Sequence, residues 1–367
     1  MDAINKTLEL FEAARKQIET AEANQLALWE NNNQTMPLLL SSSVPAGQNV
    51  SLKQHNLKEI HFDKLKMLEN GLLGALPALY GRADAVPSIR ANMGCSVFPS
   101  LLGVTPRLFE DMMPWVKEHL SKEQILRIKP TDIKTCNDFK TALEHMSYMR
   151  DILQDSPLRI YPLDLQGPFD TAHIVYGDDI FYDIYDDPEF VHHLLDLCCH
   201  AIIFGMEKCL SIILGSDKIV AHYSSLVMPR NMGGLKISED TSTLLSADTI
   251  NEFVVQYTKR ILDHFGGGYI HYCGKNDHLY KVALGMDNAF GINFGNPEMH
   301  DMNTVLNEIA KAGKVYYGNV NLLPGESERE FFTRVRKHSN DRLLLLYNAE
   351  DRDVSQILKT WIQVSGN

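Results

Sequence analysis

Short apolar segments recur along the chain with helical patterns between most of them, and this alternation limits the possible folds more than any other feature. A strand, a helix and a second strand in succession form a parallel pair, because the helix returns the chain to the same end of the sheet. The segments predicted as strands are residues 87–94, 124–130, 159–168, 233–240, 268–275, 289–296, 314–321 and 342–350. Such a series of parallel strands predicts an α/β protein with a closed (β/α)8 TIM barrel.

An open, doubly wound sheet is the alternative to a barrel. Such a sheet usually carries a glycine-rich phosphate-binding turn after its first strand. No GxGxxG or Walker A sequence occurs in this chain, so we prefer the barrel.

The beginning of the chain differs in character from the rest. Apolar residues at helical spacing predict helices over residues 2–30 and 62–80. Residues 1–85 are therefore predicted to be a helical N-terminal extension, and residues 86–367 to be the barrel domain. The extension is expected either to cover the barrel mouth as a lid or to form the contact of a homodimer, and the sequence leaves both roles open.

Charge and composition disfavour several kinds of partner. The chain has 367 residues, a formal net charge of −12 and a pI near 5.6, which argues against nucleic acid and anionic membranes. It has no run of about 18 apolar residues, and its charged amphipathic N-terminus is unlike a signal peptide. The six cysteines form no CxxC pair. A cytoplasmic, reducing location is therefore expected.

Polar residues gather at the ends of the predicted strands, where barrels of this kind carry their active sites. The candidate site residues are Arg90, Asn92, Asp164, Gln166, Asp240, His271, Cys273, Asn293, Asn319 and Glu350. Turn chemistry explains any one of them, because Asp and Asn commonly follow strands. The whole set at one rim indicates a site for a small-molecule substrate.

His271 and Cys273 are two residues apart on a predicted strand, so their side chains point to the same face. Imidazole and thiolate are both zinc ligands, and three protein ligands with one open position are typical of catalytic zinc. A buried cysteine also serves as a small apolar side chain, and that interpretation stays open. A metal site needs a third ligand from another part of the chain.

Three segments occur in a particular order: "YPLDLQGPFDTAHIVYGDDIFYDIYDDPEFVHHLL", "GGLKISEDTSTLLSADTINEFVVQYTKRIL" and "GGGYIHYCG". Together they resemble the uroporphyrinogen decarboxylase superfamily. That group includes the decarboxylase of haem synthesis and zinc-binding methyltransferases that act with a corrinoid protein. The resemblance covers residues 87–350 and implies a (β/α)8 barrel, in agreement with the strand pattern.

The resemblance is closer to the methyltransferase branch. The decarboxylase holds the propionates of its tetrapyrrole with several arginines near its N-terminus, whereas the corresponding stretch "VPSIRANMGCSVFPS" retains only Arg90. His271 and Cys273 match the His-x-Cys of the methyltransferases. Their distal cysteine has no counterpart, because no cysteine follows Cys273. A carboxylate, Glu350 or Asp351, is the expected replacement as third zinc ligand.

The resemblance implies a methyltransferase that moves a methyl group between a small molecule and a corrinoid-carrying partner protein. Zinc would activate the substrate. The residues expected to orient the substrate or carry protons are Asp240, Asp164 and Gln166, and those expected to bind it are Arg90, Asn92, Asn293 and Asn319.

Two alternatives stay open. One is a metal-free lyase, similar to the decarboxylase, in which Arg90 holds the carboxylate of a smaller substrate and Asp164 or Asp240 handles protons. The other is a binding or regulatory barrel without chemistry.

Overall fold

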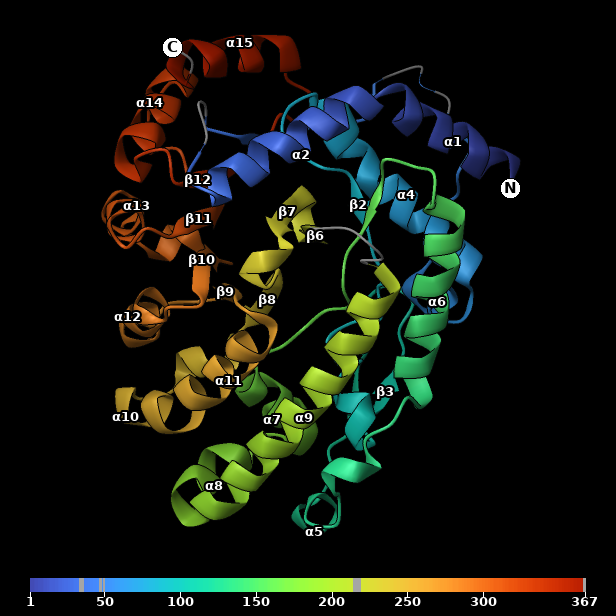
Figure 1. The fold of residues 1–367 in the computed structure, drawn as a ribbon, viewed down its shortest axis with the longest axis vertical. Coiled ribbons are helices and arrows are strands. Elements are labelled where there is room, and N and C mark those ends of the chain that lie inside the picture. The colour runs from blue at the N-terminus through green and yellow to red at the C-terminus, as the bar shows by residue number, and fades with distance from the viewer. Residues whose placement is uncertain (33–35, 46–47, 49, 214–218, 366–367) are drawn as a thin grey trace.

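A parallel sheet of six strands forms the centre of the protein (Figure 1). The computed structural model describes residues 1–32, 36–45, 48, 50–213 and 219–365. The strands of the sheet are β1 (Leu38–Ser41), β8 (Leu235–Ser238), β9 (Gly268–Tyr272), β10 (Ala289–Phe294), β11 (Val315–Gly318) and β12 (Leu343–Asn348). Their order is β1-β12-β11-β10-β9-β8, so the last five lie side by side in chain order and β1 lies at one edge. The protein is a mixed α/β protein.

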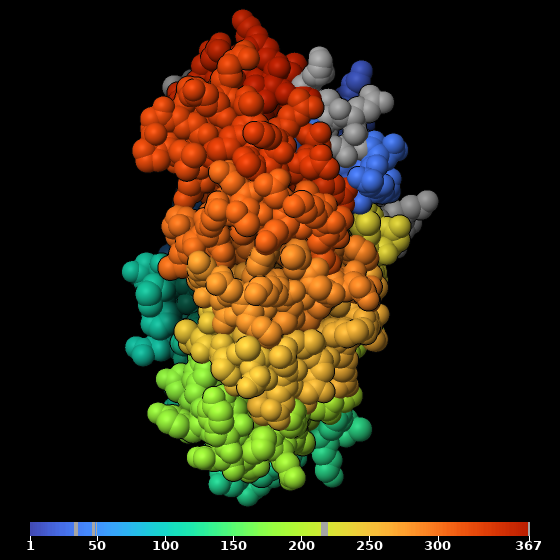
Figure 2. Space-filling model, turned by 90° about the vertical axis from the view of Figure 1, so that its left-hand side faces the viewer, coloured from blue at the N-terminus to red at the C-terminus, as the bar shows by residue number. Residues whose placement is uncertain are grey.

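Helices follow the strands of the C-terminal half one after another. They are α10 (Ala247–Ile250), a π-helical segment (Asn251–Val255), α11 (Gln256–Phe265), α12 (Asp277–Gly285), α13 (Met302–Lys311), α14 (Glu328–Ser339) and α15 (Val354–Ser365). Figure 2 shows this part of the chain, coloured from yellow to red, covering one side of the molecule in chain order. Ser246 caps the first of these helices by accepting from the backbone N–H of Thr249.

Two further strands extend the parallel arrangement. β2 (Ser88–Ile89) pairs with β5 (Arg159–Ile160), and a parallel bridge between Gln166 and Ser238 joins the chain after β5 to β8. The parallel pairings thus form one series in the order β2, β5, β8, β9, β10, β11, β12 and β1. Among the described residues, no ladder joins β1 to β2, the two ends of this series.

The prediction of a strand at residues 124–130 is wrong. Helix α5 (Lys122–Ile125) and turns occupy this segment, because Ser121 and Gln124 form a capping box that starts a helix. Its place in the series is taken by β1, which pairs with β12 along its whole length. The predicted domain boundary at residue 85 therefore falls between two strands of the series, β1 and β2.

The N-terminal helices α1 (Asp2–Ala13) and α2 (Arg15–Trp29) confirm the predicted helical pattern. α2 lies beside an antiparallel hairpin of β6 (Ile219–His222) and β7 (Leu226–Pro229) (Figure 1). The indole N–H of Trp29 donates to the carbonyl of Val227 at 2.8 Å. Side chains of α2 and β7 pack with Tyr269 and Tyr317, whereas the neighbouring Ile270 and Tyr316 belong to the main core. The hairpin and α2 therefore fill the face of the sheet opposite the outer helices.

The remaining elements belong to the chain between β1 and β6; in Figure 1, α4 lies beside β2, and α7 and α8 lie at the lower end of the molecule. They are α3 (Leu57–Phe62), α4 (Lys64–Gly81), β3 (Thr105–Arg107), β4 (Trp115–Glu118), α6 (Asn137–Leu153), α7 (Pro168–Tyr176), α8 (Ile180–Asp186) and α9 (Pro188–Ile213). α4 confirms the helix predicted over residues 62–80. Within the described ranges, no helix is both long enough and apolar enough to cross a membrane.

Candidate functional site

Three candidate metal ligands meet at the carboxyl ends of β8 and β9. Ser238 lies opposite His271 in the parallel register, so Asp240, two residues further on, comes level with Cys273. One ligand atom from each of Asp240, His271 and Cys273 lies within 4.8 Å of the others. The Nε2 of His271 is 3.6 Å from Asp240 Oδ1 and 3.7 Å from Cys273 Sγ. These residues form a possible metal-binding triad.

Backbone hydrogen bonds hold the acidic member of the triad in place. The backbone N–H of Cys273 donates to Asp240 Oδ1 at 2.6 Å. The N–H groups of Asp240 and Thr241 donate to the buried carboxylate of Asp170 at 2.7 and 2.9 Å. Gly295 leaves room for the thiol, because a Cβ at this position would collide with Cys273 Sγ. The three ligands are thus positioned by the chain itself.

Asn293 fixes the tautomer of His271. Its Nδ2 donates to the carbonyl of Tyr317, so its Oδ1 is the atom that accepts from His271 Nδ1. The proton therefore sits on Nδ1, and Nε2 keeps a lone pair that faces the other two ligands. Burial, together with the charge of Lys236, lowers the pKa of His271. The ring is neutral near pH 7, which is the form that binds a metal.

The thiol of Cys273 carries its proton when no metal is bound. Burial, and then the charge of Asp240, raises the pKa of Cys273 to about 11. A metal binds the thiolate, so metal binding must displace this proton.

The predicted third ligand, Glu350, is not a member of the triad. It follows β12, and β11 and β10 lie between β12 and β9. Neighbouring strands are about 4.8 Å apart, which separates the ends of β12 and β9 by about 14 Å along the sheet. Asp351, the other predicted third ligand, also follows β12 and is therefore also too far from His271 and Cys273. Asp240, which was predicted as a catalytic residue, is instead the third member of the triad, because β8 lies next to β9.

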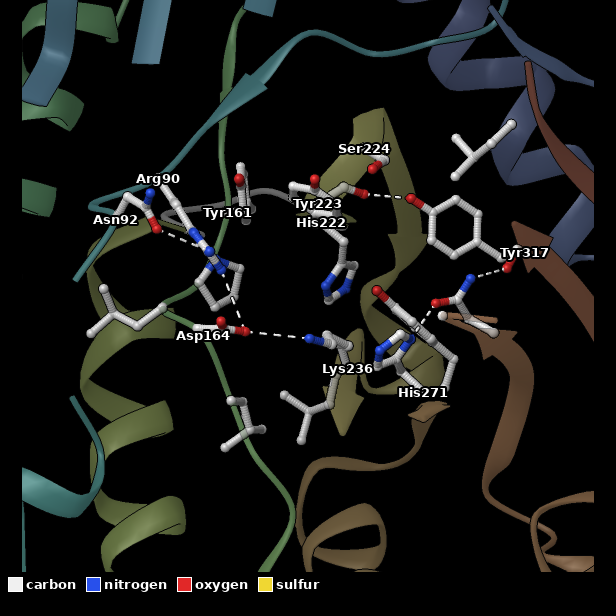
Figure 3. A pocket seen from close by; sticks show the side chains of 18 of the residues that line it. Arg90, Asn92, Tyr161, Asp164, His222, Tyr223, Ser224, Lys236, His271 and Tyr317 are labelled. Atoms are coloured by element: carbon white, nitrogen blue, oxygen red, sulfur yellow. Dashed lines mark hydrogen bonds and ion pairs between the residues drawn. The ribbon is translucent and has the colours of Figure 1, made fainter. Parts of the chain in front are cut away.

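A cavity of about 560 Å³ lies beside His271, the member of the triad that is among its lining residues (Figure 3). The predicted site residues that line it are Arg90, Asn92, Asp164, His271, Asn293 and Asn319. The structure thus brings together side chains from β2, β5, β9, β10 and β11 or from the chain that follows them. Gln166 is buried beside Ser238 and is not one of the described residues that line the cavity.

Two cations share one carboxylate in the wall of this cavity (Figure 3). Asp164 Oδ1 is 3.4 Å from Arg90 Nη1 and 3.3 Å from Lys236 Nζ. Burial alone would raise the pKa of Asp164, but Lys236 and Arg90 hold it at about 2. Asp164 is therefore ionised near pH 7, and the three groups together leave one net positive charge at the cavity.

Lys236 and His222 are two of the lining residues that the sequence did not predict. Lys236 lies in the middle of β8, two residues before Ser238, and its inward direction follows from the alternation of side chains once the strand is known. His222 ends β6, a strand for which the sequence made no prediction. His222 is 4% exposed, and its Nε2 has no hydrogen-bond partner among the described residues. Burial lowers the pKa of His222 to about 3, so this ring is also neutral.

Comparison of the chain with protein-family models and with curated proteins finds no match. The resemblance to the uroporphyrinogen decarboxylase superfamily therefore rests on the sequence segments alone.

Proposed function

We propose that the protein is a zinc-dependent methyltransferase of the uroporphyrinogen decarboxylase type, built on a (β/α)8 barrel. A corrinoid-carrying partner protein would give or take the methyl group. The observation that carries the proposal is the triad of Asp240, His271 and Cys273 at the ends of adjacent parallel strands. The series of parallel strands supports the barrel, which requires β1 and β2 to be neighbours.

The triad fits zinc better than a hard cation such as Mg²⁺. It offers one imidazole nitrogen, one sulfur and one carboxylate oxygen, and zinc accepts all three. Three protein ligands leave the fourth position of a tetrahedral site for a substrate. Bound zinc would lower the pKa of a substrate thiol or polarise the oxygen of a methyl donor.

The residues around the triad have separate tasks in this proposal. Asn293 holds the His271 ring with Nε2 toward the ligands, and Asp170 holds the backbone that carries Asp240. Arg90 and Lys236 attract a negatively charged substrate. Asp164 keeps these two cations together and, being ionised, does not donate a proton.

The metal-free lyase remains the second candidate, because Arg90 and Lys236 offer positive charge to a substrate carboxylate. It requires a proton donor for the product carbanion, and the ionised Asp164 does not provide one. Asp240 would have to take that role.

Zinc analysis of protein purified without chelator tests the proposal. We expect about one zinc per chain in the wild type, and less than about one tenth of this in His271→Ala, Cys273→Ala and Asp240→Ala. Cys136→Ala is the matched control, because this partly buried thiol precedes α6 outside the triad and should leave zinc unchanged. A wild type that holds no zinc, even after zinc is added, refutes the zinc methyltransferase. Metal-independent release of CO2 from a small carboxylic acid would then favour the lyase.

A further inference from the structure

The wall of the cavity beside His271 carries an unbalanced positive charge. Arg90 and Lys236 are both largely buried, and Asp164 is the carboxylate that they share. The two histidines of the wall, His222 and His271, are neutral near pH 7 because burial lowers the pKa of each ring. The lining residues therefore carry one net positive charge, and a ligand with one negative charge would balance it.

Both cations keep hydrogen-bond donors for such a ligand. Within the described part of the chain, Lys236 Nζ donates to Asp164 alone, which leaves two of its three N–H groups. Arg90 Nη1 lies near Asp164, and its Nη2 donates to Asn92 Oδ1 at 3.0 Å, so part of the five-donor guanidinium is left as well. A phosphate monoester carries nearly two negative charges near pH 7, whereas a carboxylate carries one. A carboxylate therefore matches the charge of this wall better.

His222 adds a second requirement on the ligand. Its side chain is almost fully buried, and Figure 3 shows the ring pointing from β6 toward the middle of the cavity. The backbone carbonyl of Gly234 lies near the ring but leaves Nε2 without a partner among the described residues. Leaving a buried ring nitrogen unpaired is costly, so a ligand that pairs with Nε2 gains affinity.

The surroundings of His222 hold its ring in this position. The ring stands edge-on to Tyr269, with the two centroids 5.3 Å apart and the planes at 83°. The backbone carbonyl of His222 accepts from Ser88 Oγ at 3.2 Å, and β6 pairs with β7 over its whole length. Among the buried side chains of the described residues that have an unpaired polar atom, His222 alone lines the cavity. Nε2 is therefore a preformed contact point for a ligand.

A hydroxyl group is the partner that fits Nε2 best. It both donates and accepts, so it pairs with this nitrogen in either tautomer of the ring. An ammonium group would also donate, but the positive wall repels it. The charge of Lys236 already acts on the His222 ring, where it adds to the effect of burial in lowering the pKa. A hydroxyl on the same small molecule as the carboxylate meets both requirements.

We propose that the cavity binds the monoanion of a hydroxy acid, whose carboxylate lies between Arg90 and Lys236 and whose hydroxyl pairs with His222 Nε2. Binding of the acid needs no metal. Its role as the substrate, or as part of a larger one, rests on the proposed function.

Three probes with one carbon skeleton test the proposal in ligand-observed NMR titrations of the full chain near pH 7. They are lactate, propionate, which lacks the hydroxyl, and lactamide, which lacks the charge. For the wild type we expect a lactate Kd on the order of 1 mM. Propionate should bind about fivefold more weakly, and lactamide at least about tenfold more weakly.

Substitutions of the wall separate the two requirements. His222→Phe keeps a ring and removes both nitrogens, so it should weaken lactate binding about fivefold and leave propionate within about twofold. Lys236→Met should weaken both acids at least about tenfold and keep the ratio between them. His145→Phe is the matched control, because His145 is also a buried histidine with an unpaired nitrogen but lies on α6 and does not line the cavity. It should leave both Kd values unchanged.

Four results would overturn the proposal. The wild type could bind no acid, or could bind lactate and propionate equally. His222→Phe could still prefer lactate, or could lose both acids equally, which would mean that the ring only supports the wall.

Cys273→Ala distinguishes this inference from the zinc methyltransferase, because hydroxy acids also bind zinc and this variant removes a proposed zinc ligand. A lactate preference that persists in Cys273→Ala supports the role of His222, whereas a preference lost there would assign it to zinc and overturn the inference. A wild type without zinc that still prefers lactate refutes the proposed function alone. A wild type with zinc that binds both acids equally refutes this inference alone.

Discussion

Replacing Asn293 with Leu tests whether the surroundings of the triad are built to hold a metal. In the wild type, Asn293 donates to the carbonyl of Tyr317 and accepts from His271 Nδ1. Leu has a similar volume and makes neither hydrogen bond. His271 then loses the contact that fixes both its ring orientation and the position of its proton.

The expected effect is a weaker zinc site in a folded protein. Loss of a hydrogen-bond partner of a metal-binding His lowers metal affinity by about 10–100-fold, which corresponds to about 1.4–2.8 kcal/mol. The Tyr317 carbonyl also loses a donor, and this should reduce the free energy of unfolding by about 1–2 kcal/mol. Competition with a chromogenic chelator near neutral pH measures the zinc Kd, and urea denaturation measures the stability.

Asn319→Leu is the matched control for this experiment. Asn319 follows the neighbouring strand β11 and lines the same cavity, but its side chain makes no hydrogen bond to the triad. Its zinc Kd should stay within about twofold of the wild type. The argument for orientation by Asn293 is refuted if Asn293→Leu binds zinc as the wild type does, or if both variants weaken zinc binding equally.

Three further predictions concern titration and charge. Because the pKa of the Cys273 thiol is raised to about 11, zinc binding should release one proton, and the zinc Kd should fall about tenfold for each pH unit between about pH 6 and 9 in metal titrations. His222 stays neutral in the folded protein down to about pH 3, whereas the unfolded chain takes up a proton near its ordinary pKa of 6.5. The free energy of unfolding should therefore fall as pH decreases from 6.5 toward 3. By about pH 4.5, the free energy of unfolding of His222→Phe, measured by urea denaturation, should have fallen by about 2–3 kcal/mol less than that of the wild type. Equal decreases in the two proteins would contradict this. Asp164→Asn leaves Arg90 and Lys236 without a counter-charge and should destabilise the protein by about 2 kcal/mol, less than for a fully buried pair because 21% of the Asp164 side chain is exposed. An unchanged urea midpoint in Asp164→Asn would show that the ion pairs contribute nothing to stability.

The sequence predicted most strands because buried parallel strands are short, apolar and separated by helices. The apolar residues of segment 124–130 favoured a strand. The sequence "SKEQ" just before it contains the capping box of Ser121 and Gln124, which starts a helix and which the prediction did not consider. β1 is also a short apolar segment, but its pairing with β12 is a contact between distant parts of the chain. No local pattern reports such a contact.

The sequence predicted that the candidate residues share one rim, but not which of them are neighbours there. His271 and Cys273 share a face because of strand alternation, which is a local rule. The choice between Asp240 and Glu350 as third ligand depends on which strand lies next to β9, and this is a property of the whole sheet. His222 belongs to a hairpin that reaches the cavity from outside the parallel sheet, so the ends of the predicted parallel strands do not indicate it.

The charges around the triad bear on the substrate of the proposed methyltransferase. In the proposed zinc complex, the thiolate of Cys273 and the carboxylate of Asp240 balance the two positive charges of zinc. A substrate bound at the fourth position as a thiolate would then add one negative charge. Arg90, Lys236 and Asp164 leave one net positive charge on the wall of the same cavity, where the low dielectric strengthens the attraction. If the proposed zinc site is present, a substrate that binds the metal as an anion is therefore attracted by the wall that Arg90 and Lys236 form.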